Sequence, residues 1–349
     1  MHLDQFNYKI PNDLIAIYPI KPRDSSKIVI VEKNFKIKNF YEIVNFLNPN
    51  DALVFNNTKV IKARLDGFIS QGKISVNLNR QIKNKNVLLT AFIKSNKKPR
   101  KKDVIRFSKN FYAIIIDIIQ NNNTKEYLLS FECSHKTFKK NLDIFGKVPL
   151  PPYINKKRVD AFSDLEDYQS ILAKKIGAVA APTASLHFTK KLLTKIKNKK
   201  IQIINITLHI NGGTFIPIKT KNINNHKMHF EFGEITENAA NKINTTKKNG
   251  GRIVAVGTTV LRLLESAKDS KGHIKPFKGE TNIFIKPGWK VNTVDGFITN
   301  FHTPKSSLLV LVCAIIGKKI TKKLYEFAIQ NKLRFFSYGD ACLIWNKNV

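Results

Sequence analysis

Histidines and small residues gather between residues 177 and 231, where their types suit a reaction site. The stretch begins with Gly177 to Ser185, a run of small residues that lets a ligand or another backbone approach closely. Four of the chain's 8 histidines fall within it: His187, His209, His226 and His229. Histidine titrates nearest neutral pH of all side chains, so this composition is more typical of a pocket lining than of a core.

A second pattern recurs through residues 177–340, where predicted strands are followed by His, Thr, Asn, Asp or Arg. In mixed α/β folds such positions gather at one edge of the sheet and form the site. Gly257-Thr258-Thr259 stands between a predicted strand and a predicted helix, which is a common anion-binding arrangement but a weak signal alone.

Two kinds of chemistry find little support. His226 and His229 are three residues apart, but the asparagines before them and the aromatics after them argue against a metal-binding helix. No third ligand stands at a recognised spacing, so no metal site is predicted. No nucleophile elbow of a Ser-His-Asp hydrolase is present.

The three cysteines are widely spread, which favours reduced thiols in a reducing compartment.

The elements that must position these residues form two units. From Gly67 onward, closely spaced strand-like runs without intervening helices predict a small β-barrel or sandwich inserted at residues 66–147. Residues 1–65 and 148–349 form the main α/β unit. Its predicted strands are 27–32, 51–56, 201–208, 252–256, 281–285, 296–300 and 341–345. Its predicted helices are 164–175, 189–196, 236–248, one after Gly257, and an apolar one near 308–316.

Two interpretations of the net charge of +35 remain open. Codon bias toward Lys, Asn and Ile would make any surface positive, whereas a nucleic-acid partner would use the charge to release counterions from phosphates. The densest basic cluster, Lys97 to Lys102, is either a solvated hairpin tip or an RNA contact. Arginines are few, and some are candidates for a planar bidentate contact, with an ordinary surface charge as the alternative for each: Arg23, Arg64, Arg158, Arg252, Arg262 and Arg334.

The N-terminus has no signal-peptide pattern, and the longest apolar run, Leu308 to Ile316, is about half a membrane span. We therefore expect a soluble, cytoplasmic protein that does not enter a membrane.

Ordered motifs along nearly the whole chain resemble the S-adenosylmethionine:tRNA ribosyltransferase-isomerase family of the queuosine pathway. The matching stretches are Tyr18-Pro19 with Pro22-Arg23-Asp24, Leu53 to Asn56, Pro149 to Ile154, Val179 to Thr189, Thr207-Leu208-His209, Gly213-Thr214-Phe215, His226 to Glu231, Ala255 to Thr259 with Arg262, Thr299 to His302 with Pro304-Lys305-Ser306, and Arg334 to Ala341. Ser185 and Thr303 depart from the usual glycine and leucine, and Val260-Leu261 replaces a more usual Ser-Val.

The resemblance implies a reaction. The ribosyl unit of S-adenosylmethionine is transferred to 7-aminomethyl-7-deazaguanine at the tRNA wobble position and rearranged to an epoxycyclopentanediol, with release of adenine and methionine. S-adenosylmethionine is then a consumed co-substrate, no cofactor is needed, tRNA is the partner, and the protein is expected to be a monomer. The implied fold is mixed α/β (α+β), with a larger barrel-like β domain flanked by helices and an inserted small Greek-key barrel-like domain.

The chemistry needs a base for the C5′ hydrogen beside the sulfonium and proton transfers at adenine and at the tRNA amine. The hypothesis is that His187, His209, His229 and His302 converge with Glu231 and Asp340. The catalytic candidates are His229 and Glu231, favoured as the acid–base pair, with His187 and His302. The substrate-binding candidates are Arg23, Thr183, His209, Thr214, His226, Arg262, Asn300, Lys305, Arg334 and Asp340. An Arg262–Glu265 pair within one helix is an equal alternative for Arg262. A non-catalytic basic RNA-binding protein and a metal-dependent hydrolase remain alternatives.

Overall fold

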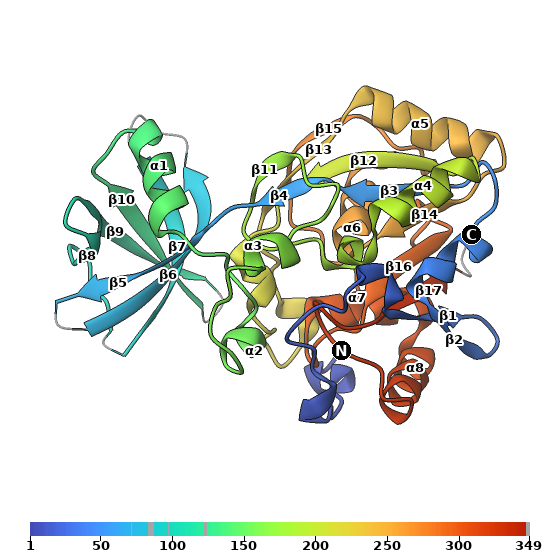
Figure 1. The fold of residues 1–349 in the computed structure, drawn as a ribbon, viewed down its shortest axis with the longest axis horizontal. Coiled ribbons are helices and arrows are strands. Elements are labelled where there is room, and N and C mark those ends of the chain that lie inside the picture. Colours follow the sequence, from blue (N-terminus) through green and yellow to red (C-terminus); the bar gives the residue numbers. More distant parts are fainter. Residues whose placement is uncertain (71, 83–86, 97, 122–123, 347–349) are drawn as a thin grey trace.

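The computed structural model describes residues 1–70, 72–82, 87–96, 98–121 and 124–346. It contains a large mixed sheet flanked by helices and, beside it, a closed β-barrel (Figure 1). The mixed α/β class expected from the sequence is confirmed. Within the described residues, none of the helices has the length and apolar character needed to cross a bilayer.

The large sheet is open and ends at strands β15 and β2, whereas the sequence suggested a barrel-like unit. Its strand order is β15 (Phe277–Thr281), β13 (Glu231–Ile235), β12 (Gln202–Leu208), β3 (Ala52–Asn56), β14 (Ile253–Val256), β16 (Gly296–Asn300), β17 (Ala341–Trp345), β1 (Lys27–Val31) and β2 (Phe35–Asn39). The central strands β12, β3, β14 and β16 are parallel to one another, and β13 and β17 run antiparallel to them. A separate pair joins β4 (Thr58–Val60) to β11 (Lys175–Ala178).

Apolar residues on both faces of the central strands explain the helical layers. Val54 and Ala255 belong to the core that includes α5 (Glu237–Lys248), α6 (Thr258–Ala267), α7 (Ser307–Ile316) and α8 (Lys318–Gln330). Their neighbours Leu53 and Val254 pack on the other side with α4 (Lys190–Asn198) and η4 (Phe40–Phe46). Strands buried on both faces read as continuous apolar runs, which is why the sequence located them.

The barrel closes through strands β5 (Arg64–Ile69), β6 (Gly72–Ile82), β7 (Val87–Ser95), β8 (Val104–Ser108), β9 (Phe111–Asn121) and β10 (Thr124–Phe131). Strand β8 returns to lie beside β5, so β5 to β8 form the expected Greek key. Helix α1 (His135–Phe145) packs Phe138 and Leu142 against the barrel core. The division of the chain into domains at residues 66 and 147 stays a prediction.

Three predicted elements differ in detail. The helix predicted at 164–175 is shorter, because α3 (Asp164–Asp167) ends early and the backbone N–H groups of Lys174 and Lys175 donate to the Asn57 carbonyl beside the β4–β11 pair. The strand predicted at 281–285 lies instead at β15, where it pairs with β13. The segment around the Lys97–Lys102 cluster crosses from β7 to β8, which are not neighbours, so it is not a hairpin tip; Lys97 itself lies outside the described residues.

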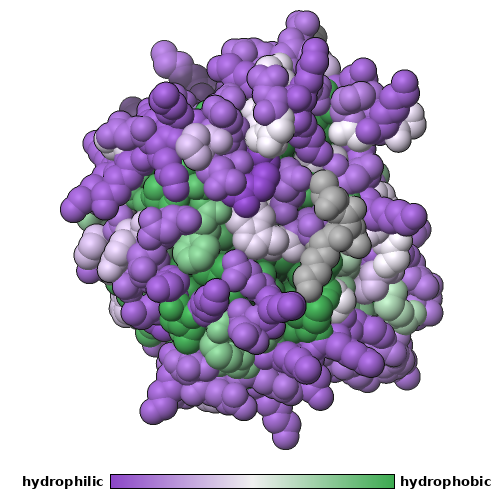
Figure 2. Space-filling model, turned by 90° about the vertical axis from the view of Figure 1, so that its right-hand side faces the viewer, coloured by the Kyte–Doolittle hydropathy of each residue, from purple (hydrophilic) through white to green (hydrophobic). Residues whose placement is uncertain are grey.

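Positive charge is spread over the molecule. Helices α4 and α8 carry exposed lysines, among them Lys190, Lys195, Lys319 and Lys322. These helices lie on the side away from the barrel (Figure 1), and the face seen from that side is mostly hydrophilic (Figure 2). Because the lysines are not confined to one face, net charge does not locate a nucleic-acid site.

Candidate active site

One edge of the large sheet collects most of the polar residues singled out in the sequence. The parallel strands β12, β3, β14 and β16 end there, and the antiparallel strands β13 and β17 begin there. Glu231, His209, Thr258, Asn300 and Asp340 therefore follow one another along this edge. Strands are spaced about 4.8 Å apart, so the edge is long, and the two cavities described below lie along part of it.

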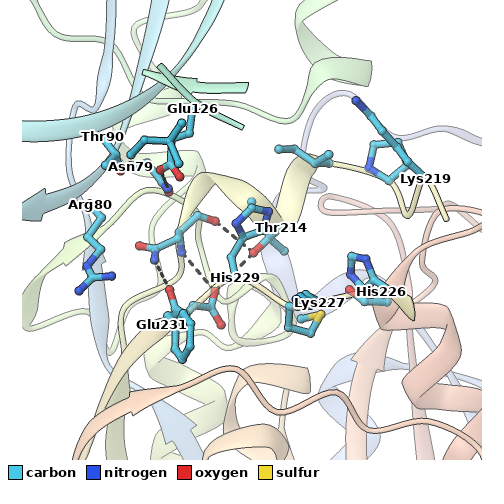
Figure 3. Close-up of a pocket in the computed structure, with 18 of the residues that line it drawn as sticks. Asn79, Arg80, Thr90, Glu126, Thr214, Lys219, His226, Lys227, His229 and Glu231 are labelled. Carbon is cyan, nitrogen blue, oxygen red and sulfur yellow. Dashed lines mark hydrogen bonds between the residues drawn. The ribbon is translucent and has the colours of Figure 1, made fainter. Parts of the chain in front are cut away.

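The larger hollow is a cavity of about 660 Å³ between the barrel and the sheet edge (Figure 3). The barrel supplies Asn79, Arg80, Ile82, Thr90, Ile119, Gln120 and Glu126. The main unit supplies most of the remaining wall, including Asn211, Gly213, Thr214, Lys219, His226, Lys227, Met228, His229, Phe230, Glu231 and Arg262.

His229 is held between the two units. A Cβ on Gly213 would lie only 2.4 Å from the His229 ring, so this close approach requires glycine. On the barrel side the His229 ring meets Phe92 edge to face, with 5.9 Å between ring centroids. Asn79 Oδ1 accepts a 2.9 Å hydrogen bond from the Gly212 backbone N–H and joins the barrel to the same turn. These contacts fix the imidazole at the cavity wall.

A buried ion pair follows His229 two residues along the chain. Glu231 at the start of β13 accepts a hydrogen bond from Arg262 of α6, and both side chains are 4% exposed. Glu231 Oε1 also accepts from the Asn211 backbone N–H at 3.2 Å. The Arg262 nitrogens Nε and Nη1 have no hydrogen-bond partner within the described residues. A buried guanidinium with unused donors can bind an oxygen of a ligand.

The alternative ion pair between Arg262 and Glu265 within α6 does not form. Glu265 instead accepts from Lys268 Nζ at 2.7 Å, Trp289 Nε1 at 2.8 Å and Thr293 Oγ1 at 2.7 Å. Arg262 is therefore available to the sheet edge.

A second, smaller cavity of about 130 Å³ adjoins the first. Thr214, Arg262 and Leu308 line both cavities. The rest of the small cavity is formed mainly by small or aromatic residues, including Tyr153, Tyr168, Ala180, Ala181, Pro182, Thr183, Ala184, Gly257, Thr258, Thr259, Asn300, Phe301 and His302. Gly257 precedes α6 with a φ of 99°, so the helix begins directly at the cavity wall. The two cavities thus meet at Arg262, whose partner Glu231 lines the large cavity alone.

Comparison with known proteins agrees with this architecture. The model of the family described as queuosine biosynthesis protein matches residues 3–344. The chain belongs to the queuosine biosynthesis protein family. The S-adenosylmethionine:tRNA ribosyltransferase-isomerase of Francisella philomiragia is 43% identical over 348 residues, covering 99% of this chain and 100% of the relative. The protein of the same name from Zymomonas mobilis is 40% identical over 349 residues, covering 99% and 100%.

A solved structure also resembles this member of the queuosine biosynthesis family. The crystal structure of S-adenosylmethionine tRNA ribosyltransferase from Thermotoga maritima has a TM-score of 0.54 and 28% sequence identity. The match covers 97% of this chain and 99% of that one. The family resemblance inferred from the motifs is confirmed, and these comparisons give no support to a non-catalytic RNA-binding protein.

The structure brings part of the predicted site together. His226, His229 and Glu231 line the large cavity, Thr183, Asn300 and His302 line the small one, and Thr214 and Arg262 line both. Within the described residues, no group of three or more His, Cys, Asp or Glu side chains could hold a metal ion.

His302 and His187 are buried and uncharged near neutral pH. Burial lowers the pKa of His302 to about 3, and its Nε2 lies 2.7 Å from Thr299 Oγ1. Burial, together with the charges of Arg23 and Arg334, lowers the pKa of His187 to about 3.

His187 reaches the small cavity only through Asn300. Asn300 Nδ2 donates to His187 Nε2 at 3.1 Å, and Asn300 Oδ1 accepts from Thr183 Oγ1 at 3.0 Å. The other ring nitrogen of His187 lies 2.7 Å from Ser26 Oγ. This chain of hydrogen bonds fixes Asn300 at the cavity wall.

The expected convergence of every candidate is not observed, because His187, His209 and Asp340 line neither cavity. His209 Nδ1 bonds Thr58 Oγ1 at 2.7 Å, and burial lowers its pKa. Asp340 accepts from the backbone N–H groups of Lys27 and Arg334 at 2.8 and 2.7 Å, and burial raises its pKa.

Three predicted binding cations also lie outside both cavities. Arg23 donates to the carbonyls of Glu166 and Gln169, Arg334 to the carbonyl of Tyr18, and Lys305 pairs with Asp4. These side chains hold loops in place at the ends of the same edge.

The barrel wall of the large cavity is what sequence reasoning missed. Asn79, Thr90 and Glu126 lie on strands whose alternating pattern places them on the outer face of the barrel, and nothing in that pattern reveals which outer residues another unit covers. The available signal was Glu126 itself, an acidic residue within a strand of a strongly basic chain.

Proposed function

We propose that this chain is an S-adenosylmethionine:tRNA ribosyltransferase-isomerase. It transfers the ribosyl unit of S-adenosylmethionine to 7-aminomethyl-7-deazaguanine at the tRNA wobble position and rearranges that unit, giving epoxyqueuosine-tRNA, adenine and methionine. S-adenosylmethionine is consumed as a co-substrate, with no other cofactor. Relatives that carry this name over their full length support the proposal. The structural observation that carries it is the meeting of two cavities at Arg262, because the reaction must join two substrates.

The two cavities suit different substrates. The large cavity lies between the units and is lined by cationic residues such as Arg80 and Lys227, which favours a base carried on a polyanionic RNA. Bases in RNA loops are unstacked and can enter such a pocket. The small cavity, with its aromatic and small residues, is below the roughly 300–1,000 Å³ of a complete ligand pocket. It therefore receives one end of S-adenosylmethionine, and the reacting ribose lies toward the junction.

Arg262 and Glu231 act together at that junction. The unpaired Arg262 nitrogens donate to an oxygen of bound S-adenosylmethionine. Glu231 holds the guanidinium in place, so we assign it a positioning role for Arg262 as well as its place beside His229. Thr214, which lines both cavities, is a binding residue for either substrate.

His229 is the proposed acid–base group. Its half-buried ring lines the large cavity, where it can take a proton from the incoming amine or from C5′ beside the sulfonium. His302 and His187 stay neutral and hold Thr299 and Asn300, so we assign them positioning roles. His226 is a further binding residue of the large cavity.

The cytoplasmic location and monomeric state expected from the family resemblance are part of the proposal. Sedimentation of the purified protein at several concentrations tests the oligomeric state.

The reaction is tested by incubating the protein with S-adenosylmethionine and tRNA bearing the 7-aminomethyl base, then analysing nucleosides and small molecules by mass spectrometry. The proposal predicts free adenine and methionine together with a ribosyl-derived addition on the wobble nucleoside. Formation of S-adenosylhomocysteine, or the absence of adenine release, would contradict it.

A further inference from the structure

The barrel presents a buried carboxylate to the large cavity. Glu126 on β10 lines this cavity and is 9% exposed. Its neighbour Tyr127 faces the barrel core opposite Ala91, so Glu126 belongs to the outer face of the barrel. Figure 3 shows Glu126 beside Asn79 and Thr90, on the side of the pocket away from His226. The barrel wall thus combines a carboxylate and a hydroxyl at Glu126 and Thr90 with Arg80, which pairs with Glu280 of the main unit, in a chain whose net charge is +35.

Glu126 lacks a cationic partner within the described residues. Its Oε1 accepts a 2.5 Å hydrogen bond from Asn79 Nδ2, and no other described residue donates to the carboxylate. A buried carboxylate held only by a neutral amide is costly unless another donor reaches it.

Thr90 gives an independent observation at the same place. It lies on β7 opposite Leu128, two residues from Glu126 along β10, and it is 7% exposed. Its Oγ1 is buried without a hydrogen-bond partner within the described residues, although the residue lines the cavity. Among the described residues, a carboxylate without a cationic partner and a hydroxyl without any hydrogen-bond partner lie on neighbouring strands of a covered face, which indicates a subsite for a polar ligand.

The backbone is shaped to present this subsite. The pairing of β6 with β7 shifts between Leu78 and Gln81, which places Asn79 and Arg80 in a β-bulge. Bulges re-aim side chains and are frequent beside active sites. Here Asn79 holds Glu126 through Nδ2 and the Gly212 backbone N–H through Oδ1, so the carboxylate is tied to the turn that supports His229.

We propose that Glu126, with Asn79 and Thr90, binds the N–H donors of the incoming tRNA base. This inference rests on the proposed function. A carboxylate repels phosphate and accepts hydrogen bonds from amines and from base N–H groups. The 7-aminomethyl-7-deazaguanine base offers both, as an exocyclic ammonium and as the N–H groups of its guanine-like pairing edge. The barrel therefore selects the base, while the sheet edge carries the reacting groups.

The experiment measures equilibrium binding of three ligands to wild type and to Glu126→Gln. The ligands are tRNA with the 7-aminomethyl base, the same tRNA with guanine at that position, and S-adenosylmethionine. Glu132→Gln is the matched control, since Glu132 is an exposed carboxylate directly after the same strand and lines neither cavity. We expect Glu126→Gln to weaken binding of the 7-aminomethyl tRNA about 10- to 100-fold, the effect of losing a charged hydrogen bond. S-adenosylmethionine binding and the control should be unchanged.

The two tRNAs separate the two sources of N–H donors. If Glu126 binds the ammonium, the variant loses the wild type's preference for the 7-aminomethyl tRNA. If Glu126 binds the pairing edge, both tRNAs weaken equally. Unchanged binding of both tRNAs, or weakening of S-adenosylmethionine alone, overturns the inference.

A second variant and a folding measurement serve as controls for this test. Thr90→Val, which removes only the buried hydroxyl, should weaken the 7-aminomethyl tRNA by a smaller factor, and circular dichroism checks that each variant is folded. Adenine release by the wild type tests the proposed function separately. If the wild type is active and the Glu126 and Thr90 variants bind like it, this inference alone fails.

Discussion

The large sheet and the barrel contribute to one cavity in different ways. The sheet brings residues far apart in the sequence to one edge, because parallel strands end on the same side. The barrel contributes its outer face, through the β-bulge in β6 and the strands β7 and β10. The sheet edge holds the buried Arg262–Glu231 pair and His229, whereas the barrel holds Glu126 and Thr90. Under the proposed function, this difference divides the reaction and the selection of the base between the two units.

Removing the imidazole of His229 should produce the largest effect on the reaction rate. It tests whether the reacting groups belong to the sheet edge. We expect His229→Ala to lower single-turnover rates about 10²- to 10⁴-fold, the usual contribution of a general acid–base group. S-adenosylmethionine affinity should change little. His273→Ala, at an exposed histidine outside both cavities, is the control. A rate near wild type in His229→Ala would remove His229 from the acid–base role.

Breaking the Arg262–Glu231 pair should destabilise the sheet edge. Arg262→Met leaves Glu231 buried without its cation, which typically costs about 3–5 kcal/mol. The double variant Arg262→Met/Glu231→Gln should recover part of this loss, because no uncompensated charge remains. Denaturant unfolding followed by circular dichroism measures both. Equal unfolding free energies in the single and double variants would contradict a coupled pair.

The buried histidines predict how stability depends on pH. Because the folded pKa values of His187 and His302 are lowered to about 3, the unfolded chain binds more protons between pH 6.5 and 3. Their stabilising contribution is therefore present above pH 6.5 and falls as pH drops, by about 1.4 kcal/mol per pH unit for each group. Unfolding free energies at pH 6.5 and 4.5 should show a smaller difference in His302→Gln than in wild type. An identical pH slope would refute a buried neutral His302.

The basic cluster at the other end of the barrel should have the smallest effect. Ser95 pairs with Ile74, at the end of β6 away from Asn79, so the cluster that follows lies beyond the cavity wall. Replacing Lys98, Arg100, Lys101 and Lys102 with glutamine should weaken tRNA binding modestly and reduce its salt dependence. Catalysis with saturating tRNA should be unaffected. An unchanged salt slope would mean that the cluster does not contact RNA.

The sequence predicted the sheet edge better than the cavity wall. Strand ends are local signals, so Asn300 and His302 could be placed at this edge from the strand they follow, whereas Thr183 became a candidate only through the family resemblance. Asp340 and Arg23 follow the same rule and lie at the same edge, but the edge is longer than the cavities. A local sequence pattern therefore predicts that a residue lies at this edge of the sheet, but it does not predict how far along the edge the residue lies from the cavities.

The barrel side depended on packing between units, which no local pattern encodes. Glu126 and Thr90 occupy outward positions that would be ordinary surface in an isolated barrel, and they become part of a cavity because the main unit supplies the opposite wall, including Thr214. Similarly, Arg262 pairs with Glu231 rather than with Glu265 because β13 lies beside α6, a contact across 31 residues.

The most direct test of the division between the two units is the affinity of Asn300→Ala for the two substrates. Asn300 lines only the small cavity, so we predict that S-adenosylmethionine binding weakens about 10-fold, the loss of one or two hydrogen bonds, while 7-aminomethyl tRNA binds as in wild type. The opposite pattern, with weakened tRNA binding and unchanged S-adenosylmethionine binding, would contradict the assignment of the two cavities.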